Sequence, residues 1–287
     1  LFSTPDTGGS RILGEVMNYG HLVLFGVMAV SLFFFFELGR PRGLQNHALA
    51  WGITALLGLG TECIQLFQPQ RSFELRDLAN DTLGAFTFLA FVYSFKIADS
   101  KRRLRLRIAL ALVCLGATTP IWLAVAEWRS MVRAFPLIGS FEHQAELGRW
   151  QTIDATMALS SKHATLGNRS LEVRLLPGTY PGVNSGYFYG DWRGYQNLAF
   201  DIYLTGATPL NLSMRIDDIH HNQEYSDRYN HTFTLAPGLN QIRIALADVA
   251  TAPVSRPMDM AAITVICLYA CRLETPRTIY LDNIRLL

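Results

Sequence analysis

Long apolar runs fill the first half of the chain, and short alternating runs fill the second half. The long runs lie before Trp128, at about residues 19–38, 48–67, 78–95 and 108–128. Each is close to the ~20 residues that cross a bilayer as a helix. A buried helix of a soluble protein is the alternative for any one of them. Four in succession, separated by short charged connections, predict a transmembrane helical bundle instead.

The hydrophobic period becomes two after residue 141. Apolar and polar residues alternate at 171–175, 198–204, 212–216 and 242–246, and Pro-Gly pairs follow Leu176, Tyr180 and Ala236. Many short half-buried strands between turns predict an all-β jelly-roll sandwich. We therefore expect a transmembrane helical domain at 1–128, a linker at 129–140 and a β-sandwich at 141–287.

The composition of the chain limits the classes of molecule that it could bind. Half of the 287 residues are hydrophobic, which favours membrane lipid as a partner, and the small net charge of +2 implies no nucleic-acid partner. Cys267 and Cys271 would lie more than ~13 Å apart on a flat strand, so we expect free thiols. The first residue is Leu1 rather than methionine, which predicts a processed or fragmentary start and leaves open whether a further span precedes it.

Basic residues predict the orientation of the helices. Arg40 and Arg42 follow the first apolar run, and six Lys and Arg residues lie between Lys96 and Arg107. Connections rich in Lys and Arg stay in the cytoplasm, so the connection at 68–77 and everything after Trp128 should lie outside. A solvated loop or a contact with lipid phosphate would explain the same basic run.

Polar residues stand at helical spacings between the second and third apolar runs. Glu62 and Gln65 are three residues apart, while Asp77, Asn80 and Gly84 stand at i, i+3 and i+7. Each set therefore shares one face of a helix. Ionisable groups inside membrane spans are costly and usually functional.

These residues, with Arg71 after the turn and His21 opening the first apolar run, resemble the core motif of the VanZ-like membrane proteins over roughly residues 15–128. One departure is that the family often has Asp-Lys where this chain has Met17 and Asn18. The resemblance implies a helical membrane fold and a link to glycopeptide-antibiotic resistance. It implies no defined reaction.

We expect the polar cluster to converge at the outer end of the helices, with Arg71 reaching back to Glu62 or Asp77. Its members are candidate catalytic residues, and they are His21, Glu62, Gln65, Arg71, Asp77 and Asn80. The alternative is that these groups only hold the helices together by hydrogen bonds.

The second half resembles galactose-binding-like jelly-roll modules that bind carbohydrate. Phe141-Glu142 opens it, Gly-Asn-Arg-Ser-Leu-Glu-Val follows at 167–173, Asp-Trp-Arg-Gly-Tyr lies at 191–195, and Tyr-Leu-Asp-Asn-Ile closes it at 280–284. The first and last strands of such sandwiches lie close together. Glu142 and Asp282 are therefore candidate ligands of a structural Ca²⁺, because calcium prefers hard oxygen ligands. The alternative is that the carboxylates cap backbone amides. No organic cofactor is expected.

Alternation predicts which groups would meet a glycan. If Leu212, Met214 and Ile216 face the core, Arg215 and Asp217 must face the other way. Carboxylates and guanidinium groups bind sugar hydroxyls, and aromatic rings stack on pyranose faces. The candidate carbohydrate-binding residues are Trp192, Tyr195, Arg215, Asp217, Asp218, His220, Tyr225 and Arg228. A buried Trp192 and a surface Arg215–Asp217 ion pair are the competing interpretation.

The sequence thus predicts an integral membrane protein that presents an extracytoplasmic glycan-binding β-sandwich. Its setting would be the bacterial inner membrane, in cell-envelope or exopolysaccharide handling or in glycopeptide-antibiotic resistance. The alternative is a membrane enzyme that acts on a lipid-linked or envelope glycan through the polar cluster, with Glu62 or His21 as acid or base. The sequence leaves open whether the protein is an enzyme.

Overall fold

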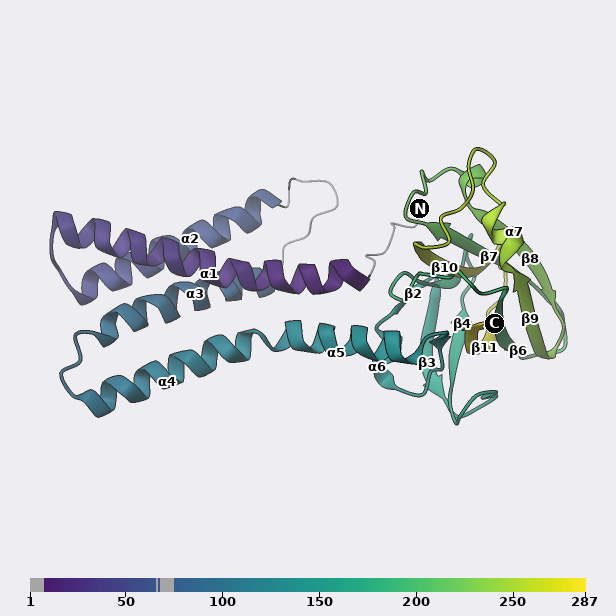
Figure 1. Ribbon diagram of the computed structural model, residues 1–287, viewed down its shortest axis with the longest axis horizontal. Helices are drawn as coiled ribbons and strands as arrows, with labels where there is room; N and C mark the ends of the chain where they lie inside the picture. Colours follow the sequence, from purple (N-terminus) through teal and green to yellow (C-terminus); the bar gives the residue numbers. More distant parts are fainter. Residues whose placement is uncertain (1–7, 66, 68–74) are drawn as a thin grey trace. The chain divides into compact units, whose positions relative to one another are not determined.

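The chain divides into a helical unit and a β-sandwich unit. The computed structural model describes residues 8–65, 67 and 75–287. Residues 11–126 form the helical unit, and residues 127–287 belong to the sandwich unit. Figure 1 labels the elements of both units.

Four long helices lie side by side in the helical unit, and a fifth follows the fourth along the chain (Figure 1). Small residues let the backbones approach closely. A Cβ on Gly84 would lie 2.0 Å from the carbonyl oxygen of Leu22, so the first and third helices touch there. The helices are α1 (Gly8–Gly39), α2 (Leu44–Gln65), α3 (Leu75–Ser94), α4 (Ser100–Ala117) and α5 (Thr119–Ala134).

Three described helical segments are long and apolar enough to cross a membrane, where four were expected. They are Arg11–Gly39, Leu44–Gln65 and Ser100–Ala134, the last comprising α4 and α5. Helix α3 is not among them, because Asp77, Asn80 and Asp81 occupy its first two turns. Large apolar side chains such as Phe35, Leu56 and Leu115 are exposed. Such a surface suits lipid rather than water, and the chain is a membrane protein.

Two connections differ from expectation. The basic run after α3 is mostly helical, because Asp99 accepts hydrogen bonds from the backbone N–H groups of Lys101 and Arg102 and so caps α4. The expected linker at 129–140 is also regular structure. It contains the end of α5 and strand β1 (Leu137–Gly139), which pairs with the last strand of the sandwich.

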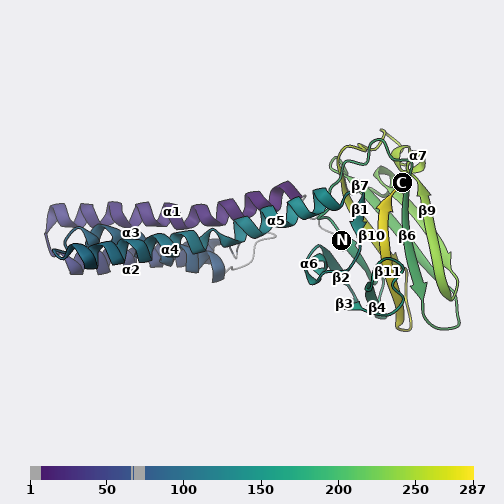
Figure 2. The ribbon, with the colours of Figure 1, turned by 60° about the horizontal axis from the view of Figure 1, so that its bottom comes forward.

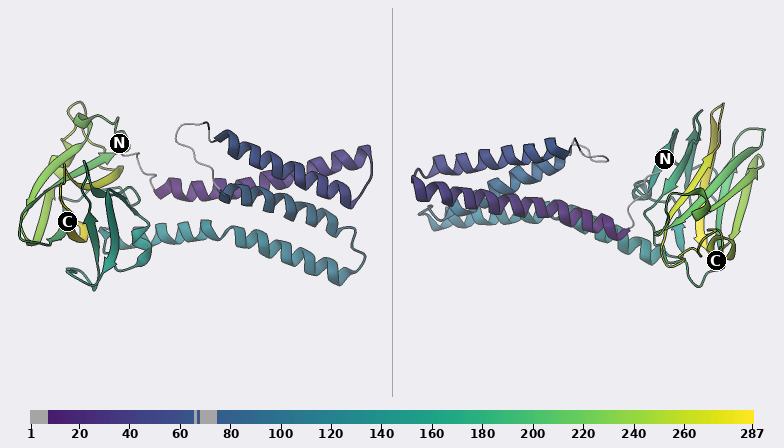
Figure 3. Two further views of the ribbon diagram at one scale, coloured as in Figure 1. Left: turned by 180° about the vertical axis from the view of Figure 1, so that it is seen from behind. Right: turned by 90° about the horizontal axis from the view of Figure 1, so that it is seen from above.

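Two antiparallel sheets form the sandwich, as expected (Figures 2 and 3). In the first sheet β1 also pairs with β11, and the strand order is β3 (Ala155–Ser160), β4 (Ser170–Leu175), β11 (Arg277–Leu286), β6 (Asn197–Leu204) and β9 (Gly238–Ala245). The order of the second sheet is β2 (Trp150–Ile153), β5 (Gly182–Ser185), β10 (Ile263–Ala270), β7 (Leu210–Asp218) and β8 (Tyr229–Leu235). Short helices α6 (Gln144–Leu147), η1 (Tyr225–Asp227) and α7 (Leu246–Ala250) lie in the connections.

The core lies between the two sheets. Leu171 and Leu281 from the first sheet share it with Leu212, Met214 and Ile216 from β7, and all five are buried. The alternation along β7 therefore sets its inner face as the sequence predicted. Its other face, which carries Arg215 and Asp217, belongs to the outer surface of the second sheet.

Candidate functional site

The outer face of the second sheet carries a groove of about 650 Å³. Strand register builds its floor. Tyr269 of β10 pairs with Ser213 of β7, which pairs with Thr232 of β8. In the next row, Arg215 of β7 pairs with Asn230 of β8. Cross-strand partners point to the same face of a sheet, so hydroxyl, amide and guanidinium groups line one surface.

Loops and strand ends supply the rim of the groove. Tyr225 is 68% exposed, and Tyr180, also exposed, contacts the Tyr269 ring edge-on at a centroid distance of 5.9 Å. The guanidinium of Arg228 lies over the Tyr225 ring at 5.1 Å, within range of a cation–π contact. The rim residues are Tyr180, Gln223, Tyr225, Arg228 and Cys271, and His231 of the edge strand β8 also lines the groove.

The Arg215 side chain is held in one orientation by Asp217. Nε of Arg215 donates to both carboxylate oxygens at 2.8 Å, and a terminal nitrogen donates to Oδ2. The two side chains are only 5% and 0% exposed. Burying such charges is costly unless they are paired, so the pair is fixed beneath the groove rather than mobile on the surface.

Two cysteines differ sharply in their surroundings. Cys267 pairs with Arg215 across the strands and is buried, and burial raises the pKa of its thiol to about 12. Cys271 is exposed at the rim, and both are free thiols. The thiolate is the reactive form, so alkylating reagents should modify Cys271 and spare Cys267 while the sandwich stays folded.

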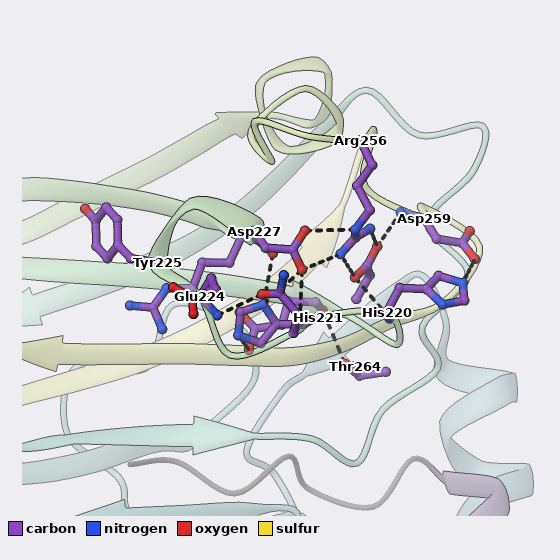
Figure 4. Close-up of polar contacts among 12 residues, drawn as sticks. His220, His221, Glu224, Tyr225, Asp227, Arg256, Asp259 and Thr264 are labelled. Carbon is purple, nitrogen blue, oxygen red and sulfur yellow. Dashed lines mark hydrogen bonds and ion pairs between the residues drawn. The ribbon is translucent and has the colours of Figure 1, made fainter.

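An ion-pair cluster fixes the loop that carries the rim residues Gln223 and Tyr225. We call Arg256, Asp218 and Asp227 the Arg256 anchor. Arg256 donates to the two oxygens of Asp218 at 2.5 and 2.7 Å, and its Nε lies 2.8 Å from Oδ1 of Asp227. Figure 4 shows Arg256 directed at Asp227. Because Asp218 precedes the loop and Asp227 ends it, the anchor holds both ends.

The anchor lowers the pKa of both carboxyl groups. Burial alone would raise the pKa of Asp218, but hydrogen bonds from Arg256 and from the Asp259 amide outweigh burial and lower it. The hydrogen bond from Arg256 is the main reason that the pKa of Asp227 is lowered. Both groups are therefore charged at neutral pH, and each stabilises the charge on Arg256.

Two histidines flank the anchor and behave differently (Figure 4). His221 is buried, and its Nδ1 lies 2.9 Å from the carbonyl oxygen of Asp227. Its Nε2 lies 3.9 Å from Asp217, so the ring connects the anchor to the Arg215–Asp217 pair. His220 is exposed and faces Asp259, with Nε2 and Oδ2 3.6 Å apart.

Three of the eight predicted glycan-binding residues line the groove, namely Arg215, Tyr225 and Arg228. Asp217 supports Arg215 from behind, and Asp218 belongs to the anchor. His220 lies outside the lining of the groove.

Trp192 and Tyr195 require a correction. Trp192 is only 1% exposed and packs beside Phe188 in the core. Tyr195 is half-buried and meets the Phe135 ring edge-on at 5.4 Å. Neither ring is part of the groove, because the turn after β5 folds inward over the core.

Sequence reasoning missed several groove residues, chiefly Tyr180, Tyr269 and Asn230. Tyr269 lies in the run Ile263–Ala270, which is almost continuously apolar and therefore shows no alternation that would identify its outer face. Tyr180 lies between two Pro-Gly turns and outside any strand. The only feature of the sequence that could have pointed to these groove residues was a cluster of tyrosines within a few residues of turn signals.

The proposed calcium ligands both accept backbone N–H groups. Oε1 of Glu142 accepts from Asn168 and Arg169, each at 2.8 Å, and these bonds lower the pKa of Glu142. Oδ2 of Asp282 accepts from the amides of Thr165 and Leu166 at 2.7 and 2.9 Å. Such donors compete with a cation for the same oxygens, so the geometry fits the capping alternative better than a calcium site.

The helical unit contains a buried acidic cluster. Asp81 of α3 is 0% exposed, and its Oδ1 lies 3.1 Å from Nδ1 of His21 on α1. Glu62 of α2 and Asp77 of α3 are also buried and lie close enough to Asp81 for their charges to act on it. The structure thus brings together three of the expected residues, with Asp81 added as the partner of His21.

The remaining members of the expected cluster lie nearby or outside the described residues. Nδ2 of Asn80 donates to the backbone carbonyl of Asn18 at 3.3 Å, which joins α3 to α1. Gln65 is half-buried at the end of α2. Arg71 lies outside the described residues. An ion pair between Glu15 and Arg76 also connects α1 with α3.

Comparison with solved structures finds likeness in the sandwich. A family 11 carbohydrate-binding module from Clostridium thermocellum, in complex with a β-1,3-1,4-mixed-linked tetrasaccharide, has 18% identity and a TM-score of 0.43. That match covers 53% of this chain and 94% of the module. An exo-β-agarase has 14% identity and a TM-score of 0.44 over 53% of this chain, but this chain spans only 24% of the agarase. A xylan-binding domain of family 22 has 16% identity and a TM-score of 0.35, covering 52% and 91%.

Comparison by sequence finds a match in the amino-terminal part of the chain. The VanZ/LLP1 family model matches residues 2–97, about a third of the sequence. A search of curated proteins gave no match. The match begins earlier than the motif-based resemblance and ends before α4. Residues 2–97 are thus similar to the VanZ/LLP1 family.

Proposed function

We propose that this membrane protein binds a polysaccharide in the groove of its β-sandwich, on the outer side of a bacterial cytoplasmic membrane. The process it serves would be the handling of cell-envelope polysaccharide or exopolysaccharide, or resistance to glycopeptide antibiotics. The observation that carries the proposal is the groove itself. It places exposed tyrosine rings beside hydrogen-bonding groups that are fixed by strand pairing.

The chemistry of the lining suits a sugar chain. Tyr180 and Tyr225 expose flat apolar rings with a polar edge, which can stack on the C–H face of a pyranose. Ser213, Asn230 and Arg215 offer donors and acceptors at fixed positions for hydroxyl groups. A groove in which polar groups set the orientation of a stacked ring is a usual design for small-molecule sites.

The distribution of charge supports the proposed placement of the sandwich outside the membrane. Arg40 and Arg42 lie after α1, while Lys101 and the arginines that follow it begin α4. Both positions should be cytoplasmic under the positive-inside rule, which requires that α3, although less apolar than the three candidate spans, also crosses the membrane between α2 and α4. The single long segment Ser100–Ala134 would then cross once and carry the sandwich to the opposite side.

A binding experiment on the full chain in a non-ionic detergent tests the proposal. Immobilised polysaccharides are screened first, and binding is then measured for Tyr225→Ala and Tyr180→Ala. Tyr203→Ala is the matched control, because Tyr203 lies on the outer face of the other sheet and packs against His163. We expect each groove variant to weaken binding about tenfold or more and the control to bind as the parent does.

Alkylation of Cys271 reports occupancy of the groove directly. In a Cys63→Ser, Cys114→Ser background, bound polysaccharide should slow the reaction of Cys271, which is exposed at the rim. The groove is the wrong surface if a polysaccharide binds without slowing the reaction of Cys271 and if both groove variants bind it as the parent does. If no polysaccharide binds, the function itself is wrong.

A second candidate function rests on the acidic cluster of the helical unit. A fully buried Asp81 beside His21, with Glu62 and Asp77 close by, offers paired groups for acid–base chemistry on a lipid-linked or envelope glycan. Substituting Asp81→Asn or Glu62→Gln separates the two functions. Loss of a glycan-dependent phenotype, with normal insertion and unchanged groove binding, would favour the enzyme.

A further inference from the structure

Positive charge exceeds negative charge in the groove. Arg215 and Arg228 both line it, and Asp217 is the carboxylate whose charge acts on Arg228. Asp217 is already engaged by Arg215. No Asp or Glu is among the described residues that line the groove. Two guanidinium groups therefore face one carboxylate, which leaves one positive charge in excess.

Arg228 is the group that carries this excess. Its Nε donates to the neutral amide oxygen of Asn230 at 3.0 Å, and its guanidinium lies over the Tyr225 ring. Half-burial and the nearby charge of Arg215 lower the pKa of Arg228. By contrast, Arg256 and Arg193 each pair with carboxylates elsewhere on the sandwich.

An anion in the groove would relieve this imbalance. A guanidinium presents a planar fork of donors that matches carboxylate and sulfate oxygens in a bidentate arrangement. The guanidinium of Arg228 lies over the exposed ring of Tyr225, so a ligand that contacts this ring could bring its acidic substituent to the guanidinium. A neutral glycan would leave the excess charge without a partner.

The geometry points to an anionic polysaccharide, one with carboxylate or sulfate groups along its chain, as the ligand of this groove, with Arg228 as the residue that selects for charge. This inference rests on the proposed function and adds the class of glycan. Tyr180, Tyr225 and Tyr269 would provide the stacking surface that any glycan uses. Arg228 would provide the preference among glycans.

Two matched pairs of polymers test the inference on the full chain in non-ionic detergent. Polygalacturonate is compared with its fully methyl-esterified form, and a sulfated galactan is compared with unsulfated agarose. We expect at least one acidic polymer to bind about tenfold or more tightly than its neutral partner at low salt. The ratio should shrink between about 0.05 and about 0.5 M sodium chloride, because salt screens charge.

Matched variants assign the preference to one residue. Arg228→Gln should remove most of the preference for the acidic polymer, and Arg228→Lys should retain part of it. Arg193→Gln removes the same charge from an exposed pair with Asp191 outside the groove, and it should leave the preference unchanged. Circular dichroism and unchanged Cys267 protection show that each variant is folded.

The outcomes separate this inference from the function on which it rests. Equal binding of neutral and acidic polymers, with Cys271 protected by both, would overturn the inference and leave the proposed function standing. A preference that Arg193→Gln reduces as much as Arg228→Gln would also overturn it, because the attraction would then be general. Absence of binding to every polymer would overturn both.

Discussion

Replacing Arg256 with methionine should destabilise the sandwich strongly. Arg256→Met keeps much of the apolar stem but removes the donors that bind Asp218 and Asp227. Both carboxylates are buried, so the variant leaves two negative charges with weakened compensation. The matched control is Arg193→Met, which breaks the exposed pair with Asp191.

The structure sets the expected size of the effect. Breaking a buried ion pair by removing one partner costs about 3–5 kcal/mol, whereas an exposed pair contributes about 0–1 kcal/mol. Arg256 is 25% exposed, and Asp218 keeps the amides of Asp259 and His220 as donors. We therefore expect Arg256→Met to cost about 2–4 kcal/mol and the control less than about 1 kcal/mol.

The difference should depend on pH. In the parent, the pKa values of Asp218 and Asp227 are lowered, so their contribution to stability is present above the unfolded pKa of about 3.9 and is lost as pH falls through the folded values. In the variant, burial without Arg256 would raise the pKa of Asp218. Protonation then removes the buried charge. The difference in free energy of unfolding between variant and parent should therefore narrow from about pH 7 to about pH 4.

The buried thiol of Cys267 provides the assay in the full chain. It reacts only when the sandwich opens, because it is buried and the pKa of its thiol is about 12. In a background where the other three cysteines are serine, its alkylation rate under weakly denaturing conditions reports the opening equilibrium. A cost of about 2–4 kcal/mol corresponds to a rate about 30-fold to 700-fold faster.

Two results would refute this reasoning. One is that Cys267 is alkylated at neutral pH in Arg256→Met at a rate within a factor of about three of its rate in Arg193→Met. The other is that the difference in stability between Arg256→Met and the parent stays constant or widens at acid pH. That result would show that buried carboxylate charge is not the cause. A double variant, Arg256→Met with Asp218→Asn, should recover part of the loss, because it removes one of the two uncompensated charges.

Three further predictions concern the rest of the chain. Gly84→Val should lower the yield and melting temperature of the folded protein, because helices α1 and α3 touch at Gly84, while Gly52→Val, with open space around it, should be tolerated. A cysteine introduced at Leu239 should react with an impermeant maleimide added outside cells, and one introduced at Ser100 should not. The opposite pattern would show that the orientation is the reverse of the proposed one. Added calcium should leave the melting temperature unchanged because Asp282 already accepts backbone N–H groups, and a rise of several degrees would establish a metal site.

Runs of neighbouring residues were enough to predict the two-part architecture. Apolar stretches indicated the membrane helices, and alternation indicated β4, β6, β7 and β9. Along β7 the sequence also determined which face meets the core, and so which face carries Arg215. These features depend on the period of a few consecutive residues, because a helix or strand repeats its side-chain directions every 3.6 or two residues.

Helix α3 falls short of the hydropathy of a candidate span, although the sequence predicted it as one. The third apolar run was assessed from its length, but Asp77, Asn80 and Asp81 lie in the first two turns of α3 and lower its hydropathy. The side chains of Asp77 and Asp81 are buried against the neighbouring helices, where Asp81 meets His21 across 60 positions of sequence. Only the packing of α1 on α3 decides that this pair forms.

Tertiary structure alone decided the composition of the groove. Tyr269 joins Ser213 and Thr232 because β10, β7 and β8 pair in that register, although the sequence of β10 shows no alternation. Trp192 leaves the expected site because its turn folds over the core. Local sequence patterns were enough to predict which elements form and which of their faces are apolar. Which polar side chains meet depends on pairing between strands far apart in the chain, and no local period records that pairing.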